Sequence, residues 1–339
     1  MYYHVHAELR TAHELGEELL RVAHRWQEPM LLHQAHHALG ITTTDRGVFV
    51  DALGHLEQAV TLYAPAQHGA HLALSVYDTG VICRAFAAHN LWYLGYPDQA
   101  AQRNKEALAL AQELAHPYSS AGTFGLAATC AALRREWHRA EERAEAVIAL
   151  SREHSFSYFL AWGMIMRGWA LSAQGRHDEG LAQLQQGLAA YRATGAAVLQ
   201  TYWCVLLAEA LSKAEQTEAG LRILDEALAT ISTSGEHRSE AELYRLRGEL
   251  LQQTGSGGPY TTSGQSSPEA CFQQALAIAR QQQAKSLELR AATSLARLRQ
   301  QQGKRAAARQ LLALVYGWFT EGFDTVDLQE ARVLLEVLA

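Results

Sequence analysis

Small residues return at near-constant spacing inside stretches whose apolar positions follow the 3.6-residue period of an α-helix. The column consists of Ala12, Ala52, Ala100, Ala140, Gly180, Gly220, Pro268 and Ala308. Successive members are 40, 48, 40, 40, 40, 48 and 40 residues apart, so each gap of 48 equals a period of 40 plus an eight-residue insertion. A fixed period of about 20 to 50 residues is typical of a solenoid, whose units bury their apolar faces only against neighbours. The pattern therefore predicts a repeat array with an extended surface for binding.

Two further columns follow at +4 and +7, which places all three columns on one helix face. The +4 column is Gly16, Leu56, Asn104, Ala144, Leu184, Leu224, Phe272 and Leu312, and the +7 column is Leu19, Ala59, Ala107, Val147, Gly187, Ala227, Ala275 and Val315. Five residues before the first column, Gly47, Gly95, Gly175 and Gly303 provide a helix stop. Each unit is therefore a helix A, a short turn and a helix B. We expect the B helices to begin near residues 9, 48, 97, 137, 177, 217, 267 and 305.

This pattern resembles the tetratricopeptide repeat, which carries a Leu-Gly pair in helix A, a turn glycine, and then Ala, an aromatic residue or Leu, and Ala in helix B. Leu39-Gly40 and Leu295-Ala296 stand at the helix A pair. The family's period is about 34 residues, so both helices should be longer here. The resemblance covers nearly the whole chain. It implies an all-α, right-handed α–α superhelix of about seven to eight helix pairs, with a C-terminal capping helix.

A narrower resemblance rests on residues 91–100 (LWYLGYPDQA), 283–298 (QAKSLELRAATSLARL) and 316–325 (YGWFTEGFDT). These segments are similar to the C-terminal repeat region of bacterial signalling proteins that carry an AAA-like or STAND-like ATPase, often with an adenylate or guanylate cyclase or a kinase domain. The resemblance implies a regulatory or sensing role and an upstream ATPase or cyclase module as a possible partner. It transfers no catalysis, because the catalytic motifs of those modules are absent from this sequence.

The register divides the chain, residues 1–339, into one solenoid. Residues 1–26 form a truncated first repeat, residues 27–322 the repeats, and residues 323–339 a capping helix with a stripe of Leu328, Ala331, Leu334, Leu335 and Leu338. We expect the first B helix to leave an apolar patch half covered, which favours a homodimer through the N-terminal end or an upstream neighbour. The insertions fall at residues 64–70, between repeats, and at residues 255–267, a Gly- and Ser-rich segment expected to be mobile. Ser267-Pro268-Glu269 then reads as a helix start.

Charge and composition exclude several functions. The net charge is −6, which argues against nucleic-acid binding because that function needs a basic surface. An arginine-rich stretch near residues 290–309 reads as a solvated face, or alternatively as a docking patch for an acidic partner. Apolar stretches stay too short for a transmembrane helix, and the first residues do not read as a signal peptide. The four cysteines form no CxxC pair, so we expect a cytoplasmic protein without disulfides.

Candidate chemistry is sparse. His33, His36 and His37 share a helix face, and the i, i+4 spacing can bind a metal. No HExxH motif accompanies them, so packing is the favoured interpretation and we expect no metal. Gly303-Lys304 lacks the rest of a phosphate-binding loop, and no GxSxG motif occurs. We therefore expect neither catalytic residues nor a cofactor, and a protein that is not an enzyme.

The tetratricopeptide resemblance also implies a binding surface, because A helices line the concave face in that family. Its inward positions correspond here to His89, Trp92, Tyr93, Trp162, Trp169, Tyr202, Glu209, Lys213, Glu242, Arg245, Glu249, Arg290 and Arg297. The alternative for Trp92, Trp162 and Trp169 is core packing between helices, and it is favoured for Trp92. The first functional hypothesis is a scaffold that binds a protein or peptide and regulates a signalling ATPase or cyclase. The alternative is an effector-sensing solenoid of a transcription activator with a small ligand in its groove.

Overall fold

The computed structural model describes residues 2–64, 66, 68–254 and 267–339, and this part of the chain contains helices and no strand. The helices are α1 (Tyr2–Val5), α2 (Leu9–Trp26), α3 (Pro29–Asp45), α4 (Phe49–Leu62), α5 (His68–Leu74), α6 (Thr79–Tyr93), α7 (Pro97–Leu114), α8 (Pro117–Leu133), α9 (Trp137–His154), α10 (Ser157–Ala173), α11 (His177–Ala193), α12 (Gln200–Lys213), α13 (Thr217–Ser234), α14 (Glu240–Thr254), α15 (Pro268–Gln281), α16 (Lys285–Gln301), α17 (Arg305–Tyr316) and α18 (Val326–Leu338). Every expected B helix begins within one residue of its predicted start. The all-α array of consecutive helix pairs is thereby confirmed.

The turn between helix A and helix B has one backbone conformation throughout the described repeats. Its central residue has a positive φ, +75° at Gly47 and +92° at Gly95 and Gly175, as the glycine column predicts. Arg135 and Glu215 occupy the same column and adopt φ of 60° without being glycine. The turn geometry is therefore set by the packing of the two helices, and glycine only makes it less costly.

The column of small residues lies where neighbouring helices are closest. Ala52, Ala100 and Ala140 are fully buried. At the α10–α11 crossing, a Cβ on Gly168 would lie 2.5 Å from the Leu184 backbone nitrogen. Only a glycine allows this approach, so the period in the sequence reports real contacts between backbones.

The two insertions differ in what the structure adds. Residues 64–70 are not a plain link between repeats, because His68–Leu74 form the short helix α5. The expected mobility of residues 255–266 falls outside the described residues. Ser267 caps α15, since its Oγ accepts a hydrogen bond from the Ala270 backbone N–H at 3.2 Å.

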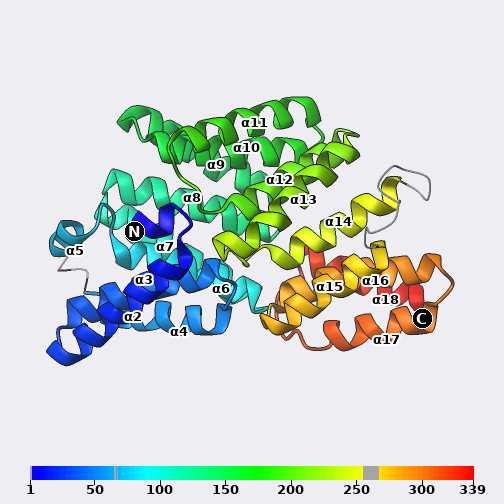
Figure 1. Ribbon diagram of the computed structural model, residues 1–339, viewed down its shortest axis with the longest axis horizontal. Helices are drawn as coiled ribbons and strands as arrows, with labels where there is room; N and C mark the ends of the chain where they lie inside the picture. Colours follow the sequence, from blue (N-terminus) through cyan, green and yellow to red (C-terminus); the bar gives the residue numbers. More distant parts are fainter. Residues whose placement is uncertain (1, 65, 67, 255–266) are drawn as a thin grey trace.

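The array bends far enough for distant repeats to meet (Figure 1). The helix α6 packs beside α16, and the Ser286 hydroxyl donates a hydrogen bond to the carbonyl oxygen of Trp92 at 2.5 Å. At the other side of the molecule, the backbone N–H groups of Ala197 and Val198 donate to the carbonyl oxygen of Val5 at 2.8 and 3.1 Å. The A helices consequently converge on the centre of the molecule; they are α6, α8, α10, α12, α14 and α16. One face of each B helix stays exposed to solvent.

The last helix, α18, packs as the sequence predicts. Leu328, Ala331, Leu334 and Leu338 are buried and Leu335 is half-buried. The helix begins directly after Thr325. Its first turn carries Asp327, which reaches the centre of the molecule and contributes to the site described next.

Candidate ligand-binding cavity

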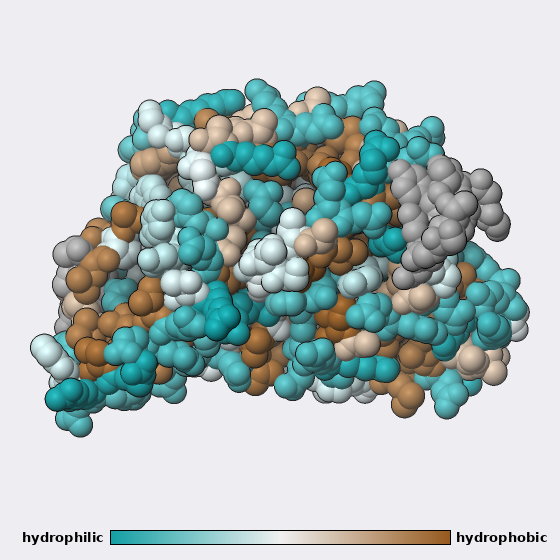
Figure 2. Space-filling view, viewed as in Figure 1, coloured by the Kyte–Doolittle hydropathy of each residue, from teal (hydrophilic) through white to brown (hydrophobic). Residues whose placement is uncertain are grey.

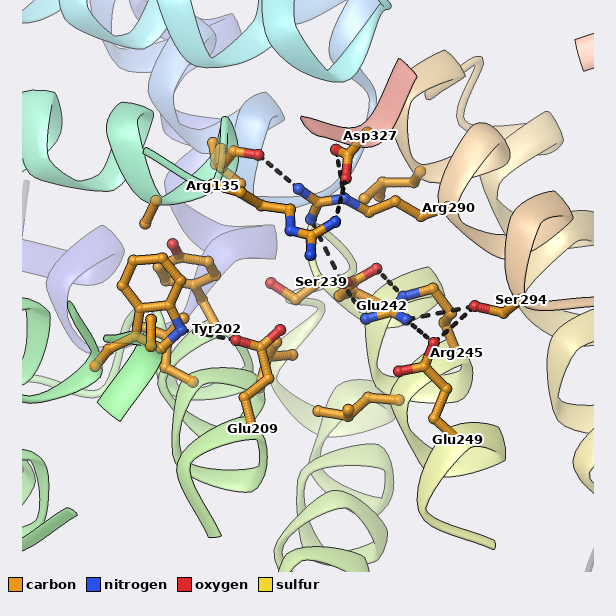
Figure 3. A pocket seen from close by; sticks show the side chains of 18 of the residues that line it. Arg135, Tyr202, Glu209, Ser239, Glu242, Arg245, Glu249, Arg290, Ser294 and Asp327 are labelled. Atoms are coloured by element: carbon orange, nitrogen blue, oxygen red, sulfur yellow. Dashed lines mark hydrogen bonds and ion pairs between the residues drawn. The ribbon is translucent and has the colours of Figure 1, made fainter. Parts of the chain in front are cut away.

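A cavity of about 360 Å³ lies where the carboxyl-terminal halves of α6, α8 and α10, together with α12, face α14 and α16 (Figure 3). The start of α18, the α8–α9 turn and the α13–α14 link complete its wall. Because the A helices supply most of the lining, the cavity occupies the concave side of the array. Its volume lies within the range of about 300–1,000 Å³ that is usual for small-molecule and side-chain pockets.

Most of the concave residues expected from the sequence come together here. The expected residues that line the cavity are Tyr93, Trp169, Tyr202, Glu209, Lys213, Glu242, Arg245, Glu249, Arg290 and Arg297. They come from α6, α10, α12, α14 and α16, so these positions, which were chosen from the repeat register, surround one common cavity.

The remaining three expected residues, His89, Trp92 and Trp162, do not line this cavity and belong to the core instead. The His89 Nε2–H donates to the Leu126 carbonyl oxygen at 2.8 Å, and burial together with the Arg238 charge lowers the pKa of His89 to about 3. Trp162 packs edge-on against Trp203, with ring centroids 5.5 Å apart. His89 therefore departs from its expected place on the concave surface, whereas Trp162 follows the core-packing alternative, because helices on both sides cover these positions of α6 and α10.

Trp92 is buried beneath a cavity residue. The Arg290 guanidinium carbon lies 4.8 Å from the centroid of the Trp92 ring, a cation–π contact that holds Arg290 in place. The core interpretation favoured for Trp92 therefore describes its position.

An ion-pair network forms one side of the cavity. Arg245 holds the Glu242 carboxylate with two hydrogen bonds of 2.8 and 2.9 Å, and Arg290 approaches the same carboxylate at 3.4 Å. Arg290 also donates to Asp327 at 2.8 Å, and Arg135 reaches Asp327 at 3.2 Å. Burial alone would raise the pKa of Glu242, but Arg245 and Arg290 outweigh it and lower that pKa to about 2. These charges hold one another in a fixed arrangement.

The same network extends to the rim of the cavity. Arg297 and Arg135 contact Glu330 of α18 at 2.8 Å each. The Ser294 hydroxyl donates to the Glu249 carboxylate at 2.8 Å. The arginine-rich stretch noted in the sequence is therefore neutralised at Arg297 by an intramolecular partner.

The opposite side carries polar groups with spare hydrogen-bonding capacity. The Trp169 indole N–H donates to Glu209 Oε2 at 2.7 Å, and no hydrogen bond within the described residues uses Glu209 Oε1. Lys213 lies one turn along α12 and forms no ion pair with the described part of the chain. Partial burial and Arg135 lower the pKa of Lys213, although Glu209 opposes this effect. Ser239 is only 3% exposed, and its Oγ has no hydrogen-bond partner. In Figure 3 the Ser239 side chain points toward the open space that Arg135 and Glu209 border.

The charges of the wall are nearly balanced. The cations are Arg135, Lys213, Arg238, Arg245, Arg290 and Arg297, and the anions are Glu209, Glu242, Glu249, Asp327 and Glu330. Arg238 is neutralised from outside the cavity by Asp45 at 3.0 Å. The wall therefore presents both signs of charge in equal number.

Sequence reasoning missed the lining residues that come from turns and from the cap: Arg135, Trp137, Arg238, Ser239, Asp327 and Glu330. Arg135 could have been found, because it stands in the column of the turn glycines and breaks its pattern. No periodic signal marks Ser239 or Asp327, since their positions depend on how far the array bends.

The histidine cluster does not converge on a common point. The His33 ring contacts the Ala59 carbonyl oxygen at 2.8 Å and the Thr79 hydroxyl at 2.7 Å. His36 pairs with His55 at 2.9 Å. Among the described residues, no group of three or more His, Cys, Asp or Glu side chains could hold a metal ion.

The described helices also include none that is long and apolar enough to span a membrane.

Comparison with known proteins gives the fold. Neither a family model nor a curated protein matches the chain. Among solved structures, the apo form of RapI superposes with a TM-score of 0.51 at 12% identity, covering 90% of this chain and 99% of RapI. A STAND signal-transduction ATPase with a tetratricopeptide repeat sensor from Pyrococcus horikoshii gives 0.44 at 15% identity, covering 98% of this chain and 48% of that protein. A Rap protein in complex with competence and sporulation factor gives 0.43 at 13% identity, covering 73% and 75%. The chain is thus similar to RapI in fold, an all-α solenoid of tetratricopeptide-like helix pairs.

Proposed function

We propose that the chain is a non-enzymatic scaffold that binds a peptide, or a segment of a partner protein, in the central cavity. The observation that carries the proposal is the set of polar groups on one side of that cavity that no other part of the described chain engages. The Ser239 hydroxyl is buried and has no hydrogen-bond partner, although buried polar groups are normally hydrogen-bonded. Glu209 Oε1 and the Lys213 ammonium are accessible to solvent and have no partner within the described residues. A ligand in the cavity would supply a partner for Ser239 and replace water at Glu209 and Lys213.

The ligand class follows from the charges. Glu209 accepts hydrogen bonds and Lys213 donates them, and they lie one helical turn apart on α12. A peptide segment with a basic and an acidic side chain, or with a backbone amide between them, satisfies both. The balanced wall disfavours a nucleotide, because several phosphates would need an excess of cations. The aromatic rings of Trp169, Tyr202 and Trp137 provide the apolar contacts that anchor such segments.

A peptide-selection experiment tests this proposal. A displayed library of random octapeptides is selected on the full chain, and the affinity of the recovered peptides is measured by fluorescence anisotropy. Glu209→Gln and Lys213→Glu should each weaken the selected peptides by about tenfold or more, the loss expected for a charged contact. Lys304→Glu, at an exposed position that does not line the cavity, is the matched control and should leave affinity unchanged. Recovered peptides that bind all three variants equally would contradict the cavity as the site.

The regulatory role belongs to the same proposal. The sequence resemblance at residues 91–100, 283–298 and 316–325 supports a partnership with a signalling ATPase or nucleotide cyclase. Peptide binding in the cavity would then change how the chain associates with that ATPase or cyclase module. Co-purification of the chain with such a module, strengthened or weakened by a selected peptide, is the expected result.

The size of the cavity favours a second candidate, an effector-sensing solenoid that binds a small molecule. A volume of about 360 Å³ suits a ligand of the size of an amino acid or a dipeptide. Native mass spectrometry of protein purified from a cell extract separates the two. A bound species of a few hundred daltons that Glu209→Gln releases supports the small ligand. Absence of such a species, together with selected octapeptides that bind, supports the peptide.

A further inference from the structure

An exposed apolar stripe runs along α2. Leu15, Val22 and Trp26 are 51%, 37% and 72% exposed, and Leu19 between them is half-buried. The spacing of four, three and four residues places all four side chains within roughly 60° of arc at 3.6 residues per turn. Alternating steps of four and three are the pattern of a helix–helix seam. Figure 2 shows apolar side chains gathered at the end of the molecule where α2 and α3 lie.

The stripe lies on a side of α2 against which no full-length helix of the described residues packs. Later B helices contact an A helix on each side, as α4 does with α3 and α6. The helix α2 packs mainly against α3, where Gly16 and Ala23 are buried, and to a smaller extent against α1, a helix of four residues. On the surface of α2 the stripe lies immediately beside the buried Gly16–Ala23 face, on the side toward solvent. It therefore offers a second helix a position equivalent to the one that A helices occupy elsewhere.

Charges beside the stripe indicate which helix fits. Glu18 and Arg25 lie on the solvent side of the stripe, seven residues apart and therefore on one line. In an antiparallel pair of α2 helices, Leu15 stacks on Trp26 of the second copy and Leu19 on Val22 of the second copy. Glu18 then faces Arg25 of the second copy, and the two-fold axis repeats the pair. A parallel pair would leave Arg25 without a carboxylate, because the other side of the stripe carries Gly16 and Ala23.

We propose that two copies of the chain associate through α2 in an antiparallel, two-fold arrangement. Arg25 has no ion pair within the described residues, so it is free to contact Glu18 of the second copy, while Glu18 exchanges its local contact with Arg21. A contact of two helices of this length lies at the low end of protein interfaces, below about 1,200 Å². The association is therefore weak, with a dissociation constant in the range of about 1–100 μM.

A charge exchange tests the arrangement. Sedimentation velocity of the full chain over roughly 1–300 μM should show a monomer–dimer equilibrium. Glu18→Arg and Arg25→Glu should each raise the dissociation constant by about tenfold or more, because each places like charges opposite one another. The double variant, Glu18→Arg with Arg25→Glu, restores the pair and should return the constant to within about threefold of the parent. Glu17→Arg, on the far side of the same helix, is the control and should have no effect.

The apolar part of the seam has its own variant. Trp26→Asp should abolish dimerisation while leaving the thermal midpoint unchanged, since Trp26 is exposed in the single chain. A chain that stays monomeric over the whole concentration range would overturn the proposal. So would a dimer that is indifferent to Trp26→Asp, or single charge variants whose loss the double variant does not repair.

Discussion

Arg238 and Asp45, which are 193 residues apart in the sequence, form a fully buried ion pair with 3.0 Å between Nη1 and Oδ1. The second carboxylate oxygen of Asp45 accepts a hydrogen bond from His4 at 2.7 Å. The Arg238 Nε–H donates to the Tyr93 hydroxyl at 3.1 Å. A single buried group of charges thus joins α1, the end of α3, the end of α6 and the α13–α14 link.

Removing the charge of Asp45 should strongly destabilise the chain. Asp45→Asn leaves the buried Arg238 guanidinium without its counter-ion, which costs about 3–5 kcal/mol of the free energy of unfolding. Urea denaturation followed by circular dichroism measures the loss. Arg10→Ala, which removes an exposed pair with Glu14, is the control and should cost less than about 1 kcal/mol. Equal, small effects in both variants would contradict the buried pair as a principal link between the repeats.

Glu236 should make the chain less stable as the pH rises. Burial and the neighbouring Asp45 raise the pKa of Glu236 to about 8, although Arg238 opposes the shift. In the unfolded chain this carboxyl ionises near its ordinary pKa of about 4.3. Between these two values the folded state binds one proton more than the unfolded state, so stability falls with rising pH by up to about 1.4 kcal/mol per unit. The stabilisation is complete below the unfolded pKa and lost above the folded one.

Glu236→Gln isolates this contribution, because the amide is neutral at every pH. Unfolding free energies at several values between pH 5 and pH 9 should decline less steeply in the variant than in the parent. Parallel curves for the two proteins would show that Glu236 is ionised in the folded chain.

The close approach of α10 and α11 predicts opposite effects for two glycines in helix interiors. An alanine at Gly168 would place Cβ 2.5 Å from the Leu184 nitrogen and 2.7 Å from the Gly180 oxygen, both backbone atoms that cannot move aside. We expect Gly168→Ala to cost about 1–3 kcal/mol or more. Gly54 lies in α4, and beyond the backbone of its own helix nothing lies within 4 Å of the Cβ position, so Gly54→Ala should gain up to about 1 kcal/mol. Thermal denaturation of the pair decides the matter, and stabilisation by both substitutions would rule out the tight crossing.

The turn column gives a reciprocal pair of substitutions. Glu215 is exposed and adopts φ of 60°, a conformation that glycine adopts at much lower cost. Glu215→Gly should therefore raise the unfolding free energy by about 0.5–1 kcal/mol. Gly175→Glu should lower it by a similar amount, because Gly175 has φ of +92° and open space around it. The two effects have opposite signs only if the backbone conformation, and no side-chain contact, is responsible.

The sequence was sufficient for the local part of this structure. The small-residue columns placed each B helix start, because close backbone contact between adjacent helices demands a small side chain at a fixed interval. The same register brought Glu209, Lys213 and Arg245 to one cavity. The repeat period in the sequence therefore predicts the contacts between neighbouring units of the array.

Contacts between distant repeats have no corresponding periodic signal in the sequence. The pairing of Arg238 with Asp45 depends on the summed rotation of many units, and a small change at each crossing would separate them. Trp162 and Trp169 are seven residues apart on α10, yet Trp162 meets Trp203 in the core while Trp169 meets Glu209 at the cavity. Both partners lie on α12, and the Trp162 indole N–H also donates to Thr129 of α8, so the surroundings of each ring depend on how α8 and α12 pack against α10.

The link between α17 and α18 is held by the beginning of α7. The Glu321 carboxylate accepts hydrogen bonds from the backbone N–H groups of Asp98 at 2.9 Å and Gln99 at 3.1 Å, and the Gly322 N–H donates to the Asp98 carboxylate at 3.0 Å. An open array loses its terminal units one at a time, since each unit touches only its neighbours. Here the α17–α18 unit can fray only after its hydrogen bonds to the start of α7 are broken. Amide hydrogens of α17 and α18 should accordingly exchange together with those of α7, in a single cooperative opening.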